Sequence, residues 1–203
     1  MTSVLERCGV YIQEQALAAG QCARVVHAMA DAPGAPAEVF ARAGEADVRP
    51  HERHARDHTL EPALEQLVAD TFEVLRPRLA AHFQQPLAWC ESPSFLSYGP
   101  GAFYRAHRDQ GRHPESAEAR GRVVSAVLCL NDGEGAAQPA FGGGRLVFYE
   151  LLDGPAWQGI GLPLDPRVGQ VAAFRSDVLH EVTPVTHGLR CVAVAWYHAT
   201  PRP

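Results

Sequence analysis

The chain has 203 residues, of which 46% are hydrophobic and 20% are charged, and its formal net charge is −5. This length and composition are those of an ordinary globular protein, and the acidic balance argues against a general nucleic-acid-binding protein. All 18 basic residues are arginine, so any mechanism that requires a lysine is excluded.

No apolar run approaches the roughly 18 residues that suggest a membrane span. The N-terminal "MTSVLERCGVYIQEQ" lacks the basic and then apolar pattern of a secretory signal. We therefore expect a cytoplasmic protein with neither a membrane nor a nucleic acid as its partner. The five cysteines are widely spaced and form no C-x-x-C pair, which argues against a disulfide framework or a structural zinc site.

The first third of the chain is predicted to be mainly helical. Residues 3–20 are rich in helix formers and end at Gly20, a typical C-terminal stop. A second helix is expected from Cys22 until the chain meets Pro33. The polar stretch 41–58 is predicted to form a loop.

A third helix is predicted over residues 59–83, where leucine and valine recur at helical spacing. Thr59 is the expected N-cap. Pro77 should kink or interrupt this helix, because proline lacks the backbone N–H of a helical turn.

After about residue 86, short strand-like runs alternate with glycine- and proline-rich turns. The runs are rich in β-branched and aromatic residues: "SFLSY" (94–98), "RVVSAVLCL" (122–130), "GRLVFYE" (144–150), "QVAAFR" (170–175) and "RCVAVAWYH" (190–198). They predict a mainly β sandwich or barrel with the N-terminal helices on one face. We see no flexible linker, which favours one domain over residues 1–203. Long connections, which are often functional, are expected at about 110–121, 131–143 and 152–168.

The segment "YRAHRDQGRHP" (104–114) contains His-Arg-Asp, a triplet that also occurs in the catalytic loop of protein kinases. That loop requires an asparagine five residues after the aspartate, where this chain has Pro114. The chain also lacks a phosphate-pairing lysine and a glycine-rich loop before the triplet. The kinase interpretation is therefore excluded.

The same segment can supply two metal ligands. On a strand or its fraying end, His107 and Asp109 point to one face while Arg108 points away. A third ligand from a later strand would complete the triad of two histidines and one carboxylate that is typical of non-heme Fe(II) oxygenases. The candidates are His180, His187 and His198. Arg190, ten residues after His180, has the planar fork that binds a carboxylate.

The sequence resembles the Fe(II)/2-oxoglutarate-dependent dioxygenases, specifically their prolyl-hydroxylase-like branch. The segments that carry the resemblance occur in the family order: "SYGPGAFYRAHRD" (97–109), "VLCLND" (127–132), "FGGGRLVFYE" (141–150), "QVAAFRSDVLHEVTPV" (170–185) and "LRCVAVAWYH" (189–198). The resemblance implies a double-stranded β-helix, or jelly roll, over 86–203, with residues 1–85 as mainly helical support.

The resemblance also implies the site. His107, Asp109 and His180 would bind Fe(II), Arg190 would bind the distal carboxylate of 2-oxoglutarate, and Tyr98 would line the co-substrate pocket. Dioxygen would be the second co-substrate. Some members of the branch have a tyrosine near the position of Cys129 that helps to hold 2-oxoglutarate. The implied reaction is oxidative decarboxylation of 2-oxoglutarate coupled to hydroxylation of a substrate C–H bond.

The resemblance suggests a prolyl residue of a protein or peptide as the substrate. A free amino acid or another small molecule is the alternative. Two other classes of function stay open: a sensor that binds 2-oxoglutarate and metal without turnover, and a zinc hydrolase that uses the same ligands. The zinc hydrolase leaves Arg190 unexplained.

Three further features have a structural and a functional interpretation. His51, His54 and His58 could bind zinc on a helix, but their polar surroundings favour a solvated loop beside the substrate entrance. Glycines 142–144 fit a tight turn into the strand that follows. Trp196 fits the core or a place beside the iron.

Overall fold

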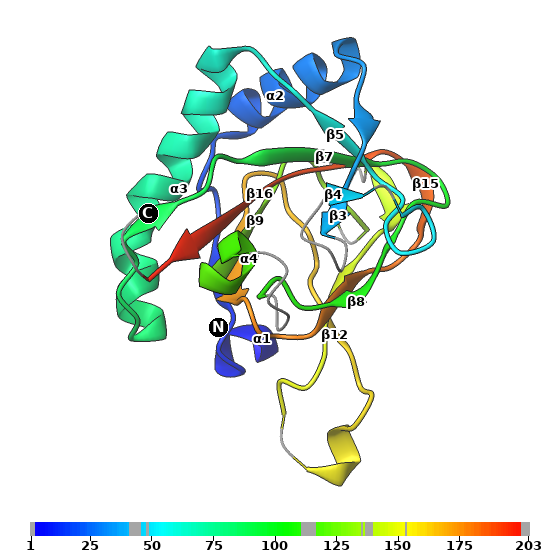
Figure 1. Cartoon of the computed structure of the whole chain (residues 1–203). Helices are drawn as coiled ribbons and strands as arrows, with labels where there is room; N and C mark the ends of the chain where they lie inside the picture. Colours follow the sequence, from blue (N-terminus) through cyan, green and yellow to red (C-terminus); the bar gives the residue numbers. More distant parts are fainter. Residues whose placement is uncertain are drawn as a thin grey trace.

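The structure is a computed structural model that describes residues 3–40, 46–47, 49–110, 117–134, 136, 140–152 and 154–199 (Figure 1). The helices are α1 (Val4–Arg7), α2 (Ala19–Asp31), α3 (Pro62–Phe83), α4 (Ala117–Gly121) and the 3-10 helix η1 (Pro155–Trp157). The strands are β1 (Tyr11–Gln13), β2 (Ala35–Pro36), β3 (Val39–Phe40), β4 (Ala46–Asp47), β5 (Arg56–His58), β6 (Trp89–Cys90), β7 (Ser94–Tyr98), β8 (Tyr104–His107), β9 (Arg122–Cys129), β10 (Phe141–Gly143), β11 (Leu146–Phe148), β12 (Leu162–Pro163), β13 (Val171–Arg175), β14 (His180–Val182), β15 (Val185–Gly188) and β16 (Arg190–His198).

A large antiparallel sheet forms the centre of the molecule, with the order β1-β13-β9-β16-β7-β5-β2 and β6 beside β16. The two central strands are buried on both faces, so they read as continuous apolar runs rather than alternating ones. Along β16, Cys191, Ala193 and Ala195 pack toward one core cluster, and Val192 and Val194 pack toward the other.

Helices α2 and α3 cover one face of this sheet (Figure 1). Helix α3 packs there through side chains at helical spacing, among them Val68, Phe72 and Leu79, all fully buried. The hydroxyl of Tyr197 on β16 donates a hydrogen bond of 2.7 Å to the Phe72 carbonyl, which joins the helix to the sheet.

The second sheet faces the opposite side of the large one and has the order β12-β11-β14-β8. Strands β10 and β15 form a separate antiparallel pair. Between the sheets lies a second core cluster that includes Phe148, Phe174 and Val192. Two facing antiparallel sheets with helices outside one of them make the mainly β jelly roll that the sequence predicted. The connection between β11 and β12, with η1 in it, projects away from the sheets (Figure 1).

The strand predictions were accurate for the large sheet. Strands β7 and β16 have the predicted bounds, and β9 and β13 are each one residue shorter. The glycines before β11 also behave as predicted. Gly143 and Gly144 have φ of +64° and +55°, and a Cβ on Gly143 would lie 2.3 Å from the Pro184 carbonyl oxygen.

The helix predicted over 3–20 was wrong. Helix α1 is one turn, and Gly9, with φ of +88°, follows it. The chain then forms β1, which pairs with β13 at the edge of the large sheet. Gly20 lies in the first turn of α2 instead of ending a helix. Sheet pairing here outweighed the local helix propensity.

Two details of the third helix also differ from the prediction. It begins at Pro62 with Glu61 at the N-cap, not at Thr59. It continues through Pro77, which does not interrupt it. Pro77 is exposed, so the backbone carbonyl that loses its hydrogen bond there can be solvated.

The predicted loops are only partly described. Within 41–58, residues 41–45 and 48 lie outside the described residues, and 56–58 form β5 of the large sheet instead of a loop. Within 110–121, residues 111–116 also lie outside the described residues, and 117–121 form α4. Residues 135, 137–139 and 153 of the other two connections are not described either. Among the described helices, none is long and apolar enough to cross a membrane.

Candidate metal centre and its pocket

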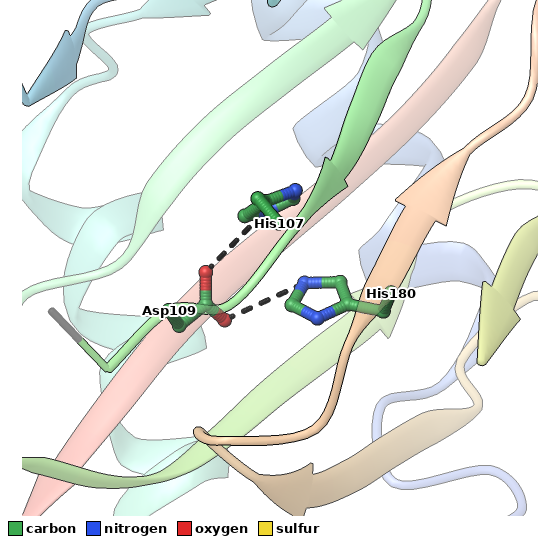
Figure 2. Close-up of side chains that lie close together, drawn as sticks. All are labelled: His107, Asp109 and His180. Atoms are coloured by element: carbon green, nitrogen blue, oxygen red, sulfur yellow. Dashed lines mark ion pairs between the residues drawn. The ribbon is translucent and has the colours of Figure 1, made fainter. Parts of the chain in front are cut away.

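Three predicted ligands lie together between the two sheets (Figure 2). His107 ends β8, Asp109 follows two residues later, and His180 begins β14. The register of the strand pair places His107 directly opposite His180. Nε2 of His107 lies 3.4 Å from Oδ1 of Asp109, and Nε2 of His180 lies 3.7 Å from Oδ2. One ligand atom from each residue falls within 4.8 Å of the others, so the group can hold a metal ion.

Hydrogen bonds fix the orientation of both imidazoles. Nδ1 of His107 lies 2.8 Å from the Arg105 carbonyl oxygen, and Nδ1 of His180 lies 3.0 Å from that of Val178. A carbonyl can only accept, so each Nδ1 carries the proton. In the neutral imidazole, Nε2 then has the free lone pair and faces the cluster, as metal coordination requires.

The charge states also suit a metal. Burial and the neighbouring His107 together lower the pKa of His180 to about 4, although Asp109 partly opposes this, so the imidazole stays neutral. Burial opposes the charge of Asp109, but the adjacent His180 and His107 hold the pKa of this carboxyl below its usual range. A neutral imidazole and an ionised carboxylate are the forms that bind metal.

Ring packing restrains the two histidines. His107 stacks on Tyr104 with centroids 3.6 Å apart, and His180 contacts the edge of Phe174 at 4.7 Å. The Arg108 side chain points away from the metal cluster, as predicted. Its guanidinium donates to the Asp177 carbonyl and to the Glu150 carboxylate.

The other histidine candidates lie apart from the cluster. His187 contacts the neighbouring Thr186 hydroxyl, and His198 pairs with Glu91. The zinc interpretation of the earlier histidines was wrong within the described residues. His51 and His54 are exposed, whereas the ring of His58 is buried against the Ser97 hydroxyl at 2.8 Å.

A pocket of about 640 Å³ contains the cluster and extends to Arg190 and Tyr98. Arg190 begins β16 and lies directly opposite Tyr98 of β7. Its guanidinium carbon is 5.0 Å from the centroid of the Tyr98 ring. Arg190 is only 3% exposed, and its Nη1 has no hydrogen-bond partner within the described chain. A buried cation with an unpaired donor is costly, so the pocket is built for an anionic group.

Cys129 takes no direct part in this pocket. It lies in the core cluster between the sheets and is not one of the lining residues. Burial raises the pKa of its thiol to about 11, an effect that the nearby Arg190 only partly opposes, so it stays a neutral thiol.

The sequence analysis missed a polar network in the pocket wall. The Glu91 carboxylate accepts from Nε and Nη2 of Arg122, each at 2.7 Å, and contacts Nε2 of His198 at 2.7 Å. The Arg122 guanidinium lies 3.8 Å above the Trp196 ring, whose buried Nε1 has no partner in the described chain. Strand alternation could have placed Trp196 on the pocket face with Arg190, because six residues separate them. Nothing in the sequence pointed to Glu91.

Comparisons with known proteins agree with this geometry. The family model of the 2OG-Fe(II) oxygenase superfamily matches residues 93–198, a range that includes all five predicted site residues. A PKHD-type hydroxylase of Klebsiella pneumoniae (strain 342) is 34% identical over 113 residues, which cover 55% of this chain and 44% of the relative. The match thus spans less than half of that relative's length.

Solved structures share the fold over nearly the whole chain. A prolyl-4-hydroxylase of Pseudomonas putida is 28% identical with a TM-score of 0.68, covering 96% of this chain and 94% of its own. The viral collagen prolyl hydroxylase of Paramecium bursaria Chlorella virus-1, solved with 2OG, is 16% identical with a TM-score of 0.65 and coverage of 98% and 100%. A prolyl hydroxylase of Trichoplax adhaerens, solved with a peptide fragment, is 18% identical with a TM-score of 0.70 and coverage of 96% and 86%.

Proposed function

The chain belongs to the 2OG-Fe(II) oxygenase superfamily, and we propose that it hydroxylates a C–H bond of its substrate with Fe(II), 2-oxoglutarate and dioxygen. One observation carries this proposal. The His107–Asp109–His180 cluster lies in the same pocket as the buried guanidinium of Arg190, whose Nη1 has no hydrogen-bond partner among the described residues.

His107, Asp109 and His180 would hold the iron. Their Nε2 atoms and the ionised carboxylate converge from β14, β8 and the residues just after β8, as the triad of two histidines and one carboxylate that suits Fe(II). Arg190 would bind the distal carboxylate of 2-oxoglutarate through its planar fork, with Tyr98 beside it.

The protein's own contribution is orientation and a dry site. When bound, the iron, 2-oxoglutarate and dioxygen would supply the oxidising chemistry, in which 2-oxoglutarate loses carbon dioxide and gains one atom of dioxygen to become succinate, and the other atom goes to the substrate. Buried apolar side chains of Leu146, Val182 and Val192 line the pocket and exclude water from the reacting groups. We assign no general acid or base to this chain.

For the substrate, we infer a prolyl residue in a protein or peptide. The support is the 28% identity to a prolyl-4-hydroxylase over almost the full length of both chains. The pocket wall agrees with a peptide: the buried Trp196 Nε1 lacks an acceptor within the described chain, and a main-chain carbonyl of a peptide could supply one.

Succinate formation tests the proposed reaction. Protein purified and loaded with Fe(II) under nitrogen, then given 2-oxoglutarate and dioxygen, should form succinate slowly even without substrate. The Asp109→Ala variant is the matched control and should form none. Absence of succinate from wild-type protein with confirmed iron content, across candidate substrates, would contradict the proposal.

Mass spectrometry identifies the substrate class. Lysate proteins and metabolites are compared after incubation with wild-type or Asp109→Ala protein. The expected product is a prolyl residue that has gained one oxygen atom. Oxygen gained by a free amino acid would show a small-molecule hydroxylase, and tight metal-dependent 2-oxoglutarate binding without any product would show a sensor.

A further inference from the structure

Arg53 is fixed beside the strand that carries His107. The segment that precedes β5 lies along β8, where Arg53 forms a β-bridge with Tyr104. The backbone N–H of Arg105 donates to the Glu52 carbonyl at 2.9 Å, and that of His54 donates to the Phe103 carbonyl at 2.8 Å. The main chain around Arg53 is therefore held at the side of the candidate metal centre.

The Arg53 side chain faces the pocket. It lines the same cavity as the metal cluster, and its guanidinium carbon lies 4.8 Å from the centroid of the Tyr104 ring. The same ring stacks on the imidazole of His107. Arg53 thus lies one aromatic ring away from a candidate iron ligand.

One nitrogen of the Arg53 guanidinium is anchored, the Tyr98 side chain lies beside the group, and another nitrogen has no partner among the described residues. Nη1 donates to the Glu38 carbonyl oxygen at 2.8 Å, but Nε is buried and has no hydrogen-bond partner among the described residues. No carboxylate of the described chain forms an ion pair with Arg53 within 4.0 Å. The edge of a guanidinium that includes Nε is one that binds a carboxylate bidentately.

Two carboxylates of the pocket are engaged elsewhere. Glu91 is neutralised by Arg122, and Glu65 accepts a hydrogen bond from the backbone N–H of Leu60 at 3.3 Å. Burial raises the pKa of Asp57, although the charge of Arg53 partly opposes this, and the two form no ion pair. A partly buried arginine with no carboxylate within ion-pair distance among the described residues is costly, so its partner is expected to come with a ligand.

We propose that Arg53 binds a carboxylate of the substrate, so that the enzyme selects peptides with an acidic side chain near the hydroxylated residue. This inference rests on the proposed function. In that proposal Arg190 would bind the distal carboxylate of 2-oxoglutarate and the iron would bind the carboxylate at its other end, so a carboxylate at Arg53 belongs to a different molecule. Arg53 is thus a specificity-determining residue and not a metal or co-substrate ligand.

Matched peptides test the inference directly. The probes are labelled prolyl peptides in pairs, with Glu or Gln at each position flanking the proline. Their binding is measured by fluorescence anisotropy under nitrogen, on protein loaded with Fe(II) and 2-oxoglutarate. For at least one position, wild-type protein should bind the Glu peptide about tenfold more tightly than its Gln partner, as a charge-assisted bidentate contact predicts.

Three variants separate charge, geometry and general effects. Arg53→Gln should remove the preference for the Glu peptide, and Arg53→Lys should retain part of it, because lysine keeps the charge but not the fork. Arg78→Gln is the matched control: Arg78 is exposed on α3, and the preference should not change. Peptide-independent succinate formation checks that each variant is folded and loaded.

The outcomes distinguish the inference from the proposed function. Equal binding of every Glu and Gln pair, or no binding of any peptide, by protein that forms succinate overturns the inference alone. A raised KM for 2-oxoglutarate in Arg53→Gln with an unchanged peptide preference also overturns it, because the contact would then belong to the co-substrate. If succinate never forms but the preference depends on Arg53, the proposed function fails and the carboxylate site stands.

Discussion

At the scale of single residues, the candidate centre depends on one carboxylate between two imidazoles. Asp109 lies within 4 Å of both Nε2 atoms, and backbone carbonyls hold the other ring nitrogens. The cluster therefore presents its three ligand atoms before any ion binds. Little reorganisation is needed on metal binding, which favours affinity.

Replacing Asp109 with alanine removes the only negative charge of the cluster. Fe(II) affinity of the variant should fall by more than the ~10–100-fold typical of losing an outer-shell partner, because a direct ligand is lost. Metal titration followed by elemental analysis measures this. The control is Asp177→Asn, which removes a nearby carboxylate that pairs with Arg175 instead. Equal iron binding by Asp109→Ala and wild type would show that the metal binds elsewhere.

Arg190 should control the affinity for 2-oxoglutarate but not that for iron. Arg190→Ala removes charge-assisted hydrogen bonds of about 1.5–3 kcal/mol, so the KM for 2-oxoglutarate should rise about 10–150-fold. The KM of Arg190→Lys should lie between those of wild type and Arg190→Ala, because lysine keeps the positive charge but lacks the planar guanidinium. Arg175→Gln, on the exposed end of β13, is the control and should leave the KM unchanged. An unchanged KM in Arg190→Ala would separate this pocket from the co-substrate.

At the scale of elements, two short segments position the site: the β8–β14 pair and the glycine turn that leads into β11. The turn matters because it supports Arg190. A Cβ on Gly144 would lie 2.8 Å from Cγ2 of Val185 and 3.1 Å from Cδ of Arg190. The backbone of the turn thus passes where only glycine leaves room for the arginine.

Gly144→Ala should therefore raise the KM for 2-oxoglutarate several-fold. The added methyl group pushes against the Arg190 side chain, and the positive φ adds about 1 kcal/mol of strain. Gly101→Ala is matched, because Gly101 has φ of +79° but open space around its Cα. It should lose similar stability without a change in KM. The same rise in KM for both variants would mean that strain alone, and not contact with Arg190, is responsible.

The packing of α3 against the large sheet should dominate stability. Phe72 is fully buried, so Phe72→Ala is expected to lower the free energy of unfolding by about 3–5 kcal/mol. Val74, two residues later on the same helix, is 71% exposed. Val74→Ala should therefore change the free energy of unfolding by less than about 0.5 kcal/mol. Urea denaturation measures both. A loss of similar size at the two positions would contradict the observed packing.

The sequence predicted the central strands well because they are buried on both sides and carry continuous β-branched runs. The resemblance named five site residues, and all of them lie in one pocket of the structure: His107, Asp109, His180, Arg190 and Tyr98. Their roles stay predictions. Strands at the edge of the sheet were harder to predict from the sequence. Strand β1 has three residues, and its pairing with β13 is a long-range contact that local propensity cannot show.

Long-range contacts also explain the site features that the sequence analysis missed. Glu91 lies 31 residues from Arg122 and 107 residues from His198, so no spacing pattern joins the three. Arg53 was predicted to be part of a solvated loop. It lines the pocket because the backbone of its segment pairs with β8.

At the scale of the whole molecule, the N-terminal part does more than support the core. Strands β1, β2 and β5, all from the first 85 residues, are members of the large sheet. The helical support and the jelly roll therefore share one sheet. The division into helical support (1–85) and jelly-roll core (86–203), and their union in one domain, stay predictions.

The measurement that tests the account most directly is a crystal structure of the protein grown under nitrogen with Fe(II) and 2-oxoglutarate. We predict one iron bound by Nε2 of His107, a carboxylate oxygen of Asp109 and Nε2 of His180. The distal carboxylate of 2-oxoglutarate should pair with Arg190. Iron bound away from these ligands, or 2-oxoglutarate whose distal carboxylate contacts another residue, would contradict the account.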